Sequence, residues 1–296
     1  MYGTYPTHCE VRRSGSGEGS FKAAGASDVC WVMAEPWLRV LTCDECRAFD
    51  ARAMKELGIP SLLLMENASK NASDVAAALL EERHGMVQNV PVLIVCGSGN
   101  NGGDGYAMAR HLTIAGARVR VLAMTPVESL KGDALVMARI ARAMDVPIDD
   151  LGPDAGATLS GAMAPRPNLI IDAIFGTGLS RAVDGVAADL INAINASNIT
   201  VLAIDVPSGL NADTGTPMGV AIRATATVTM AGLKPGLVRL EAQEFVGDLS
   251  VVDIGVPSDF AADLGTILDI EDASGDDAEE DDPDFGEDSD RSRERL

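Results

Sequence analysis

Three stretches of the chain combine glycine or proline with polar side chains directly after an apolar run. Residues 97–105 read GSGNNGGDG, residues 172–181 read DAIFGTGLSR, and residues 205–215 read DVPSGLNADTG. In parallel α/β sheets, ligands bind outside the carboxyl ends of the strands. If the apolar runs are strands, chemistry is therefore expected at these three loops.

The first loop contains a G-x-G-x-x-G pattern that begins at Gly97. Glycines of this spacing let the backbone approach a phosphate at a helix N-terminus, so we predict phosphate contact here. A dinucleotide-binding site would also need an acidic residue about 20 positions later for the ribose, where this chain reads LAMT at 122–125. An NAD-dependent oxidoreductase is therefore disfavoured. A plain turn would leave the clustered Asn100, Asn101 and Asp104 unexplained.

Two of the apolar runs end in an acidic residue, Asp172 and Asp205. A carboxylate at such a position is costly unless it is paired, hydrogen bonded or coordinated to a cation. Because buried carboxyls with shifted pKa values serve as general acids and bases, Asp172 is a candidate catalytic residue. The alternative is a structural acid that accepts hydrogen bonds from loop amides. Arg181 is a candidate charge partner for phosphate.

Oxygen donors recur across the three loops, in Asn101, Asp172, Asp205 and Ser208. A set with amide, carboxylate and hydroxyl oxygens but no His or Cys is typical of a hard cation. Ser208 is not expected to be a hydrolytic nucleophile, because the chain lacks G-x-S-x-G and no His follows Ser208.

The five cysteines form an odd set, which favours reduced thiols over a disulfide framework. Cys43 and Cys46 make a C-x-x-C pair, but zinc would need two further ligands at matching spacing. We interpret the pair as ordinary residues of a helix start. Lys234 is a weaker candidate for a phosphate contact, with a surface position or loop packing as the alternative.

The elements that would position these loops alternate between helix and strand. A capping box at Thr42 and Glu45 begins a helix that ends near Gly58, and a second helix is predicted from Ser61 to about Arg83. Apolar runs then cover 92–96, 119–123, 169–171 and 201–204, with helices expected at about 104–115, 131–144 and 186–196. Shorter β-prone segments follow at 225–229 and 249–254. The pattern predicts an α/β fold, a doubly wound, mainly parallel sheet with helices on both faces, as in a Rossmann-like three-layer sandwich.

Composition sets the outer limits of function and of the folded part. The 296 residues carry a net charge of −21, which argues against binding to nucleic acid or to an anionic membrane surface. From Glu271 to the end, thirteen residues are acidic and three are basic. We therefore predict a poorly ordered extension over 1–36, one domain over 37–265 and an acidic disordered tail over 266–296. No secretory signal is visible, which favours a cytoplasmic protein.

The motifs LTCDECRAFD, LLLMENA, VCGSGNNGGDGYAMARHL, IIDAIFGTGLSR, AIDVPSGLNADTG and GLKPGL occur in this order. Over about residues 38–257 the chain resembles the NAD(P)H-hydrate epimerase family, the YjeF N-terminal-type domain. The resemblance implies an isomerase of nicotinamide nucleotide repair that interconverts the R and S epimers of hydrated NADH and NADPH (NADHX and NADPHX). A separate NAD(P)H-hydrate dehydratase would use the S epimer, because the sequence carries no dehydratase domain. A homodimer is also implied.

The resemblance assigns roles to residues of all three loops. It implies one potassium ion per subunit at Asn101, Asp172 and Ser208, in agreement with the oxygen donors. It implies that the hydrated nucleotide binds to a set of loop residues: Asn100, Asn101, Gly102, Gly103, Asp104, Gly176, Thr177, Gly178, Leu179, Ser180, Arg181, Ala182 and Asp205.

The chain departs from the family pattern at Ser69, where the family usually has glycine, and at Ala182, where proline is common. A non-catalytic binding or scaffold module of the same fold is the main rival hypothesis. Retention of Asp172, Asn101 and the complete NNGGDG loop disfavours that rival, because a scaffold has no use for them.

Overall fold

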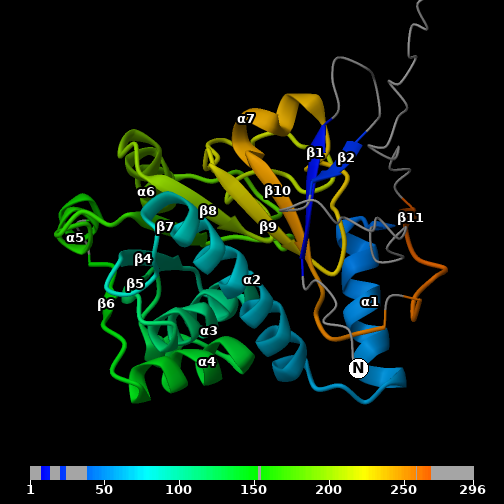
Figure 1. Cartoon of the computed structure of the whole chain (residues 1–296), viewed down its shortest axis with the longest axis horizontal. Helices are drawn as coiled ribbons and strands as arrows, with labels where there is room; N and C mark the ends of the chain where they lie inside the picture. The colour runs from blue at the N-terminus through cyan, green and yellow to red at the C-terminus, as the bar shows by residue number, and fades with distance from the viewer. Residues whose placement is uncertain (1–7, 14–20, 25–38, 153–154, 258, 268–296) are drawn as a thin grey trace, which may run out of the picture.

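The structure is a computed structural model, and it describes residues 8–13, 21–24, 39–152, 155–257 and 259–267 (Figure 1). Its elements, in chain order, are β1 (His8–Arg13), β2 (Phe21–Ala24), β3 (Arg39–Val40), α1 (Cys43–Glu56), α2 (Ser61–His84), β4 (Pro91–Cys96), α3 (Asn100–Ile114), β5 (Arg118–Ala123), the short 3-10 helix η1 (Val127–Ser129), α4 (Gly132–Ala143), β6 (Ile148–Asp150), α5 (Ala155–Ala162), β7 (Leu169–Ala173), α6 (Gly185–Ala196), β8 (Thr200–Ile204), β9 (Ala226–Met230), η2 (Leu240–Ala242), α7 (Gln243–Val246), β10 (Asp248–Val252) and β11 (Thr266–Ile267).

One large sheet runs through the middle of the molecule, with strands in the order β2-β1-β10-β9-β8-β7-β4-β5-β6. The seven strands from β10 to β6 pair in parallel. Side chains alternate between the two faces: Ile94 of β4 lies in a core with residues of α2, α3 and α4, whereas Leu93 and Val95 lie in a second core with residues of α5 and α6. The predicted doubly wound fold is confirmed.

The winding of the chain reverses between β4 and β7, which are neighbours in the sheet. The helix that follows β4 packs on one face and leads to β5, while the helix that follows β7 packs on the other face and leads to β8 (Figure 1). The helices that follow the two strands therefore lie on opposite faces of the sheet. Such a switch point opens a crevice at the carboxyl edge of the sheet.

Helix α1 lies beside this edge and is fixed at its N-terminus and along its buried face. The predicted capping box is confirmed, because Thr42 Oγ1 accepts a hydrogen bond from Glu45 N and Thr42 N donates to Glu45 Oε2. Phe49 and Ala53 pack in a small core with residues of α2 and of the segment after β10. The backbone before the helix is fixed as well, since Leu41 N donates to Leu233 O at 2.7 Å.

The glycine-rich loop differs from expectation, since α3 begins at Asn100 rather than near Asp104. Gly99 is the extended N-cap residue, and the NNGGDG residues form the first turns of the helix. The early start depends on Gly102, because a Cβ atom there would lie 2.0 Å from Gly97 O. The close contact between Gly102 and the backbone of Gly97 thus makes the loop between β4 and α3 shorter than the sequence pattern predicts. The sequence also missed β6 and α5.

Part of the predicted poorly ordered extension is paired in the structure. β1 pairs antiparallel with β10, and β2 pairs antiparallel with β1. For these ten residues the structure therefore departs from the expectation over 1–36, because the free edge of β10 supplies backbone partners that a search for side-chain periodicity does not detect. At the other end, β11 pairs with β3, and the predicted tail beyond residue 267 lies outside the described residues. No helix in the described ranges has the length and apolar character needed to cross a membrane.

Removal of the cap should weaken α1 measurably. Thr42→Ala loses the acceptor for Glu45 N, so we expect the free energy of unfolding to fall by about 1 kcal/mol. Urea denaturation followed by circular dichroism measures the change, and Thr42→Ser, which keeps the hydroxyl, is the matched control. Equal stability of the Ala and Ser variants would show that the cap does not stabilise the helix.

Candidate active site at the carboxyl edge of the sheet

The three predicted loops meet at the crevice between β4 and β7. Gly176 marks the meeting point, because a Cβ atom built there would lie 2.6 Å from Asp205 Oδ2 and 3.4 Å from Asn101 Cγ. These contacts join the start of α3, the loop after β7 and the loop after β8. Only glycine fits at position 176 without displacing the two polar side chains.

Asp172 is fully buried at the carboxyl end of β7 and accepts hydrogen bonds from two loops. Its Oδ1 accepts from Ser208 Oγ at 2.6 Å and from Ile174 N at 3.3 Å, and its Oδ2 accepts from Ser208 N at 2.8 Å. Burial raises the pKa of Asp172 to about 6, against the opposing effect of these hydrogen bonds. The carboxyl group is therefore a structural anchor for Ser208 as well as a group that can exchange a proton near neutral pH.

Asn101 is buried, and neither its Oδ1 nor its Nδ2 has a hydrogen-bond partner among the described residues. An unpaired buried amide costs roughly 1–3 kcal/mol. Buried polar groups in folded proteins are nearly always satisfied, so an orphaned side chain indicates a missing partner. Asn101 therefore points to a ligand that supplies an acceptor for Nδ2 and a donor or a cation for Oδ1.

A buried ion pair lies under the loop after β8. Lys234 Nζ is 2.8 Å from Asp205 Oδ1, and it also donates to Thr229 Oγ1 at 2.8 Å and to Met230 O at 2.9 Å. Burial opposes the charge of Lys234, but Asp205 and other neighbouring groups raise its pKa above the ordinary value. With only 2% of its side chain exposed, Lys234 is packed below the site, so it is not placed to contact a phosphate directly.

A pocket of about 170 Å³ lies between the loop after β7, the loop after β8 and the first turn of α1. It is lined by Cys43, Arg47, Gly176, Thr177, Gly178, Leu179, Ser180, Leu210, Asn211, Ala212 and Asp213. The wall formed by α1 is attached to the loop after β8, because Cys43 N donates to Asp213 Oδ1 at 2.9 Å. Arg47 is the one cationic side chain among the lining residues.

The thiols of this wall are not reactive. Burial and the nearby carboxylate of Asp213 raise the pKa of Cys43 to about 12, and burial raises that of Cys46 to about 11. A thiol attacks or binds metal as the thiolate, which is scarce at such pKa values. In the described part of the chain, no group of three His, Cys, Asp or Glu side chains is arranged to hold a metal ion.

Comparison with known proteins assigns the family. The family described as YjeF-related protein N-terminus matches residues 61–236. The NAD(P)H-hydrate epimerase of Rhodopirellula baltica is 38% identical over 228 residues, which are 76% of this chain and 89% of that protein. That of Levilactobacillus brevis is 40% identical over 219 residues, 74% of this chain and 94% of that protein. The chain belongs to this family.

Two further similarities concern domain context and fold. The bifunctional NAD(P)H-hydrate repair enzyme Nnr of Moorella thermoacetica is 40% identical over 225 residues, which are 75% of this chain but 42% of that protein. The crystal structure of the yeast protein ynu0 superposes with a TM-score of 0.66 at 22% identity and covers 79% of this chain and 96% of that chain. The latter similarity supports the fold alone.

The residues that the family resemblance assigns to the nucleotide are only partly together. Gly176, Thr177, Gly178, Leu179 and Ser180 line the pocket. Asn101 and Asp205 meet at Gly176, while Asn100 is exposed at the start of α3. Gly102 packs on Gly97, and Gly103 on Met65 and Ala134, so both glycines serve close packing. Arg181 and Ala182 are exposed and do not line the pocket.

The sequence analysis missed the contribution of α1 and of residues 210–213 to the pocket. Arg47 gave no signal, because an exposed arginine on a helix is ordinary. Asp213 lies within a quoted motif, but its partner Cys43 is 170 positions away in the chain. The backbone hydrogen bonds from Leu41 N to Leu233 O and from Gly236 N to Ala212 O bring these distant segments together.

The Asp205–Lys234 pair should contribute strongly to stability. Lys234→Met leaves the Asp205 carboxylate without its cation, and we expect the free energy of unfolding to fall by roughly 3 kcal/mol. The double variant Lys234→Met/Asp205→Asn removes both charges and should recover part of this loss. Denaturation of Lys234→Met, Asp205→Asn and the double variant measures the coupling. Strictly additive losses would show that the two groups do not interact.

Proposed function

We propose that the protein is an NAD(P)H-hydrate epimerase, an isomerase that interconverts the R and S forms of hydrated NADH and NADPH. The observation that carries the proposal is the convergence of Asn101, Gly176 and Asp205 at the sheet switch point, next to the buried Asp172. Membership of the family supplies the reaction, since the relatives from R. baltica and L. brevis carry this name. The retained polar set favours an enzyme over a scaffold.

The substrate explains why a proton-exchanging carboxyl is needed. In a hydrated nicotinamide the hydroxyl group is on the carbon next to the ring nitrogen, so the C–O bond can break while the nitrogen lone pair stabilises the resulting cation. Asp172 gives a proton to the departing hydroxide and takes one from the water that adds to the other face. A ring-opened aldehyde would require the same acid and base. The chemistry thus needs proton transfer and a fixed substrate, and no net redox change.

The nucleotide is held by backbone groups more than by charges. The N-terminus of α3 carries N–H groups that favour an anion, and it faces the crevice. The glycine-rich segment 176–180 lines the adjacent pocket. These two features together would hold the phosphates and orient the ring for transfer of the proton.

The residues present fit a potassium ion at Asn101, Asp172 and Ser208. Asn101 Oδ1 is unpaired, and Asp172 Oδ2 accepts a single hydrogen bond from Ser208 N, so each retains a lone pair. Ser208 Oγ accepts from Phe175 N and has a second lone pair available. All three donors are oxygens, as a hard cation prefers. When bound, the ion would supply positive charge that fixes the loops and the substrate.

The proposed activity also implies a partner enzyme, an oligomeric state and a cellular location. A separate dehydratase would consume the S epimer, and the bifunctional relative Nnr of M. thermoacetica indicates that epimerase-like and further segments can share one chain. We also propose a homodimer and a cytoplasmic location. The rival hypothesis is a binding module of the same fold without catalysis, and the experiment below separates the two.

Substitution of Asp172 tests the proton carrier. We expect Asp172→Asn to abolish epimerisation, because an amide cannot exchange the proton, while nucleotide binding stays measurable. The assay uses purified R-NADPHX with an excess of an S-specific dehydratase and follows the return of reduced-nicotinamide absorbance. Asp189→Asn, an exposed acid on α6, is the matched control.

The outcomes separate three roles. Loss of turnover with retained binding of NADPH supports Asp172 as the acid and base. Loss of binding and stability together indicates that Asp172 only anchors Ser208 and its loop. Near-normal turnover removes Asp172 from the mechanism, and a wild-type rate equal to spontaneous epimerisation favours the binding module.

Potassium should activate and stabilise the protein through Asn101. We expect faster epimerisation in potassium than in lithium buffer, and a higher Tm in potassium because a ligand of the folded state stabilises it. Asn101→Ala should lose both effects, whereas Asn100→Ala, at the exposed neighbouring position, should keep the higher Tm. An unchanged potassium response of Asn101→Ala would contradict the proposed ion site.

A further inference from the structure

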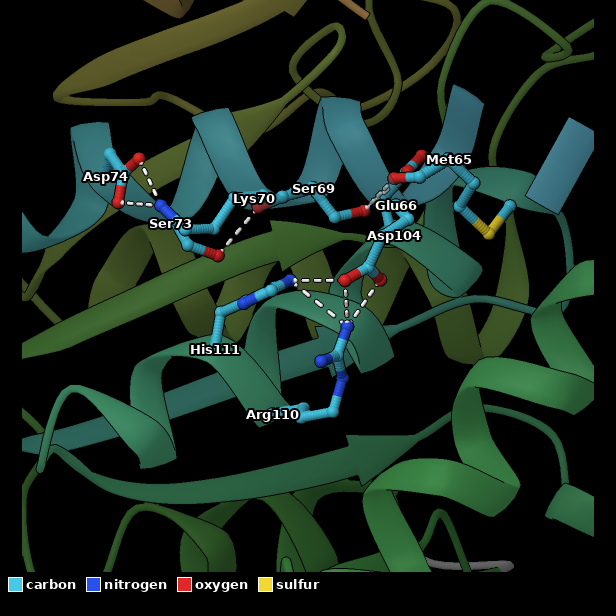
Figure 2. A network of polar contacts seen from close by, with 9 residues as sticks. All are labelled: Met65, Glu66, Ser69, Lys70, Ser73, Asp74, Asp104, Arg110 and His111. Atoms are coloured by element: carbon cyan, nitrogen blue, oxygen red, sulfur yellow. Dashed lines mark hydrogen bonds and ion pairs between the residues drawn. The ribbon is translucent and has the colours of Figure 1, made fainter. Parts of the chain in front are cut away.

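Helices α2 and α3 are joined by a network of polar side chains (Figure 2). At one place Glu66 of α2 pairs with Arg110 and His111 of α3. At another, Ser69 of α2 reaches Asp104 near the start of α3. The second contact leads directly to the candidate active site, because Asp104 lies three residues after the orphaned Asn101.

The Ser69 hydroxyl has two partners but only one hydrogen. Its Oγ lies 2.7 Å from Met65 O and 2.9 Å from Asp104 Oδ1. A carbonyl oxygen only accepts, whereas a carboxyl group accepts when ionised and can donate when protonated. The hydroxyl therefore fits both states of Asp104. It donates to the ionised carboxylate, or it accepts from the protonated carboxyl and donates to Met65 O.

Ser73, one turn further along α2, provides the comparison within the same helix (Figure 2). Like Ser69 it is buried, and its Oγ also donates to the carbonyl four residues earlier, Ser69 O, at 2.7 Å. It makes no side-chain hydrogen bond to α3 among the described residues. The two serines thus share burial and the backbone bond, and they differ in the contact with Asp104.

The buried environment of Asp104 favours its protonated form. Only 8% of the residue is exposed, and burial raises its pKa well above the ordinary value, while the Ser69 hydrogen bond acts in the opposite direction. Four titratable side chains from other elements act on it electrostatically: Asp50 of α1, Cys96 of β4, Asp205 after β8 and Lys234 after β9. An anionic nucleotide at the start of α3 would further favour the protonated form.

We propose that Ser69 is a positioning residue for Asp104. The Ser69 hydroxyl reorients, so that Asp104 can take up or release a proton without leaving a buried group unpaired. The role of this exchange, proton uptake when the anionic nucleotide binds, rests on the proposed function. Ser69 stands where the family resemblance gives glycine as the usual residue. Glycine offers Asp104 no hydroxyl partner.

The direct test is the titration of Asp104 in the ligand-free full-length protein, with aspartate labelled by carbon-13 at the side-chain carboxyl. The Asp104 resonance is the one missing from Asp104→Asn. Because a hydrogen bond to a charged acceptor is stronger than one to a neutral group, we expect Ser69→Ala to raise the titration midpoint by about one pH unit. Ser73→Ala should leave it unchanged, and Ser69→Gly should repeat the Ala result.

Two results overturn the proposal: an unchanged midpoint in Ser69→Ala, or a wild-type Asp104 that does not titrate between roughly pH 5 and pH 9, the range where most proteins stay folded. An equal rise in Ser73→Ala would show a general effect of helix packing and would overturn it as well. The pH profile of epimerisation provides a second measurement, which should shift upward in Ser69→Ala alone. If the wild type has no epimerase activity, the proposed function fails, but the carbon-13 comparison still decides the role of Ser69.

Discussion

The carboxylate of Asp172 is the one group on which the geometry of the site depends. A charge removed from water costs several kcal/mol unless hydrogen bonds or a cation compensate it. Here Ile174 N, Ser208 N and Ser208 Oγ supply the compensation, and they come from two loops that follow different strands. The requirement to satisfy one buried acid therefore fixes the loop after β7 against the loop after β8, and Gly176 is placed against Asn101 as a result.

The ion pair between Asp205 and Lys234 also fixes the site. It explains why the backbone of Asp205 keeps an unfavourable conformation. Asp205 has a φ of 67°, a conformation that costs a non-glycine residue about 1–2 kcal/mol. Its two carboxylate oxygens bind Lys234 Nζ and Thr177 N, so two interactions hold the conformation. Because Leu233 is hydrogen bonded to the backbone before α1, the same pair connects the floor of the pocket to its wall.

Sequence alone predicted the features that depend on local pattern. Apolar runs gave the four central strands, and the Thr42–Glu45 capping box gave the start of α1. The acids at the ends of β7 and β8 were also correctly placed at the carboxyl edge of the sheet. Local pattern could not show that α3 begins at Asn100, because that start depends on contact between Gly102 and Gly97 O. Nor could it show the wall formed by α1, which depends on contacts between distant parts of the chain.

Because Arg47 is the one cationic side chain that lines the pocket, recognition of an anionic nucleotide by so acidic a protein must rely largely on neutral donors. The net charge of −21 repels an anion at long range, and the buried Lys234 is already neutralised by Asp205. In the described part of the chain, the N–H groups of Gly176, Gly178 and Ser180 donate to no protein acceptor, although all three residues line the pocket. Free backbone amides favour an anion through their dipoles. The Thr177 amide between them is held by Asp205, so the same contact that fixes the loop leaves its neighbouring donors open for the ligand.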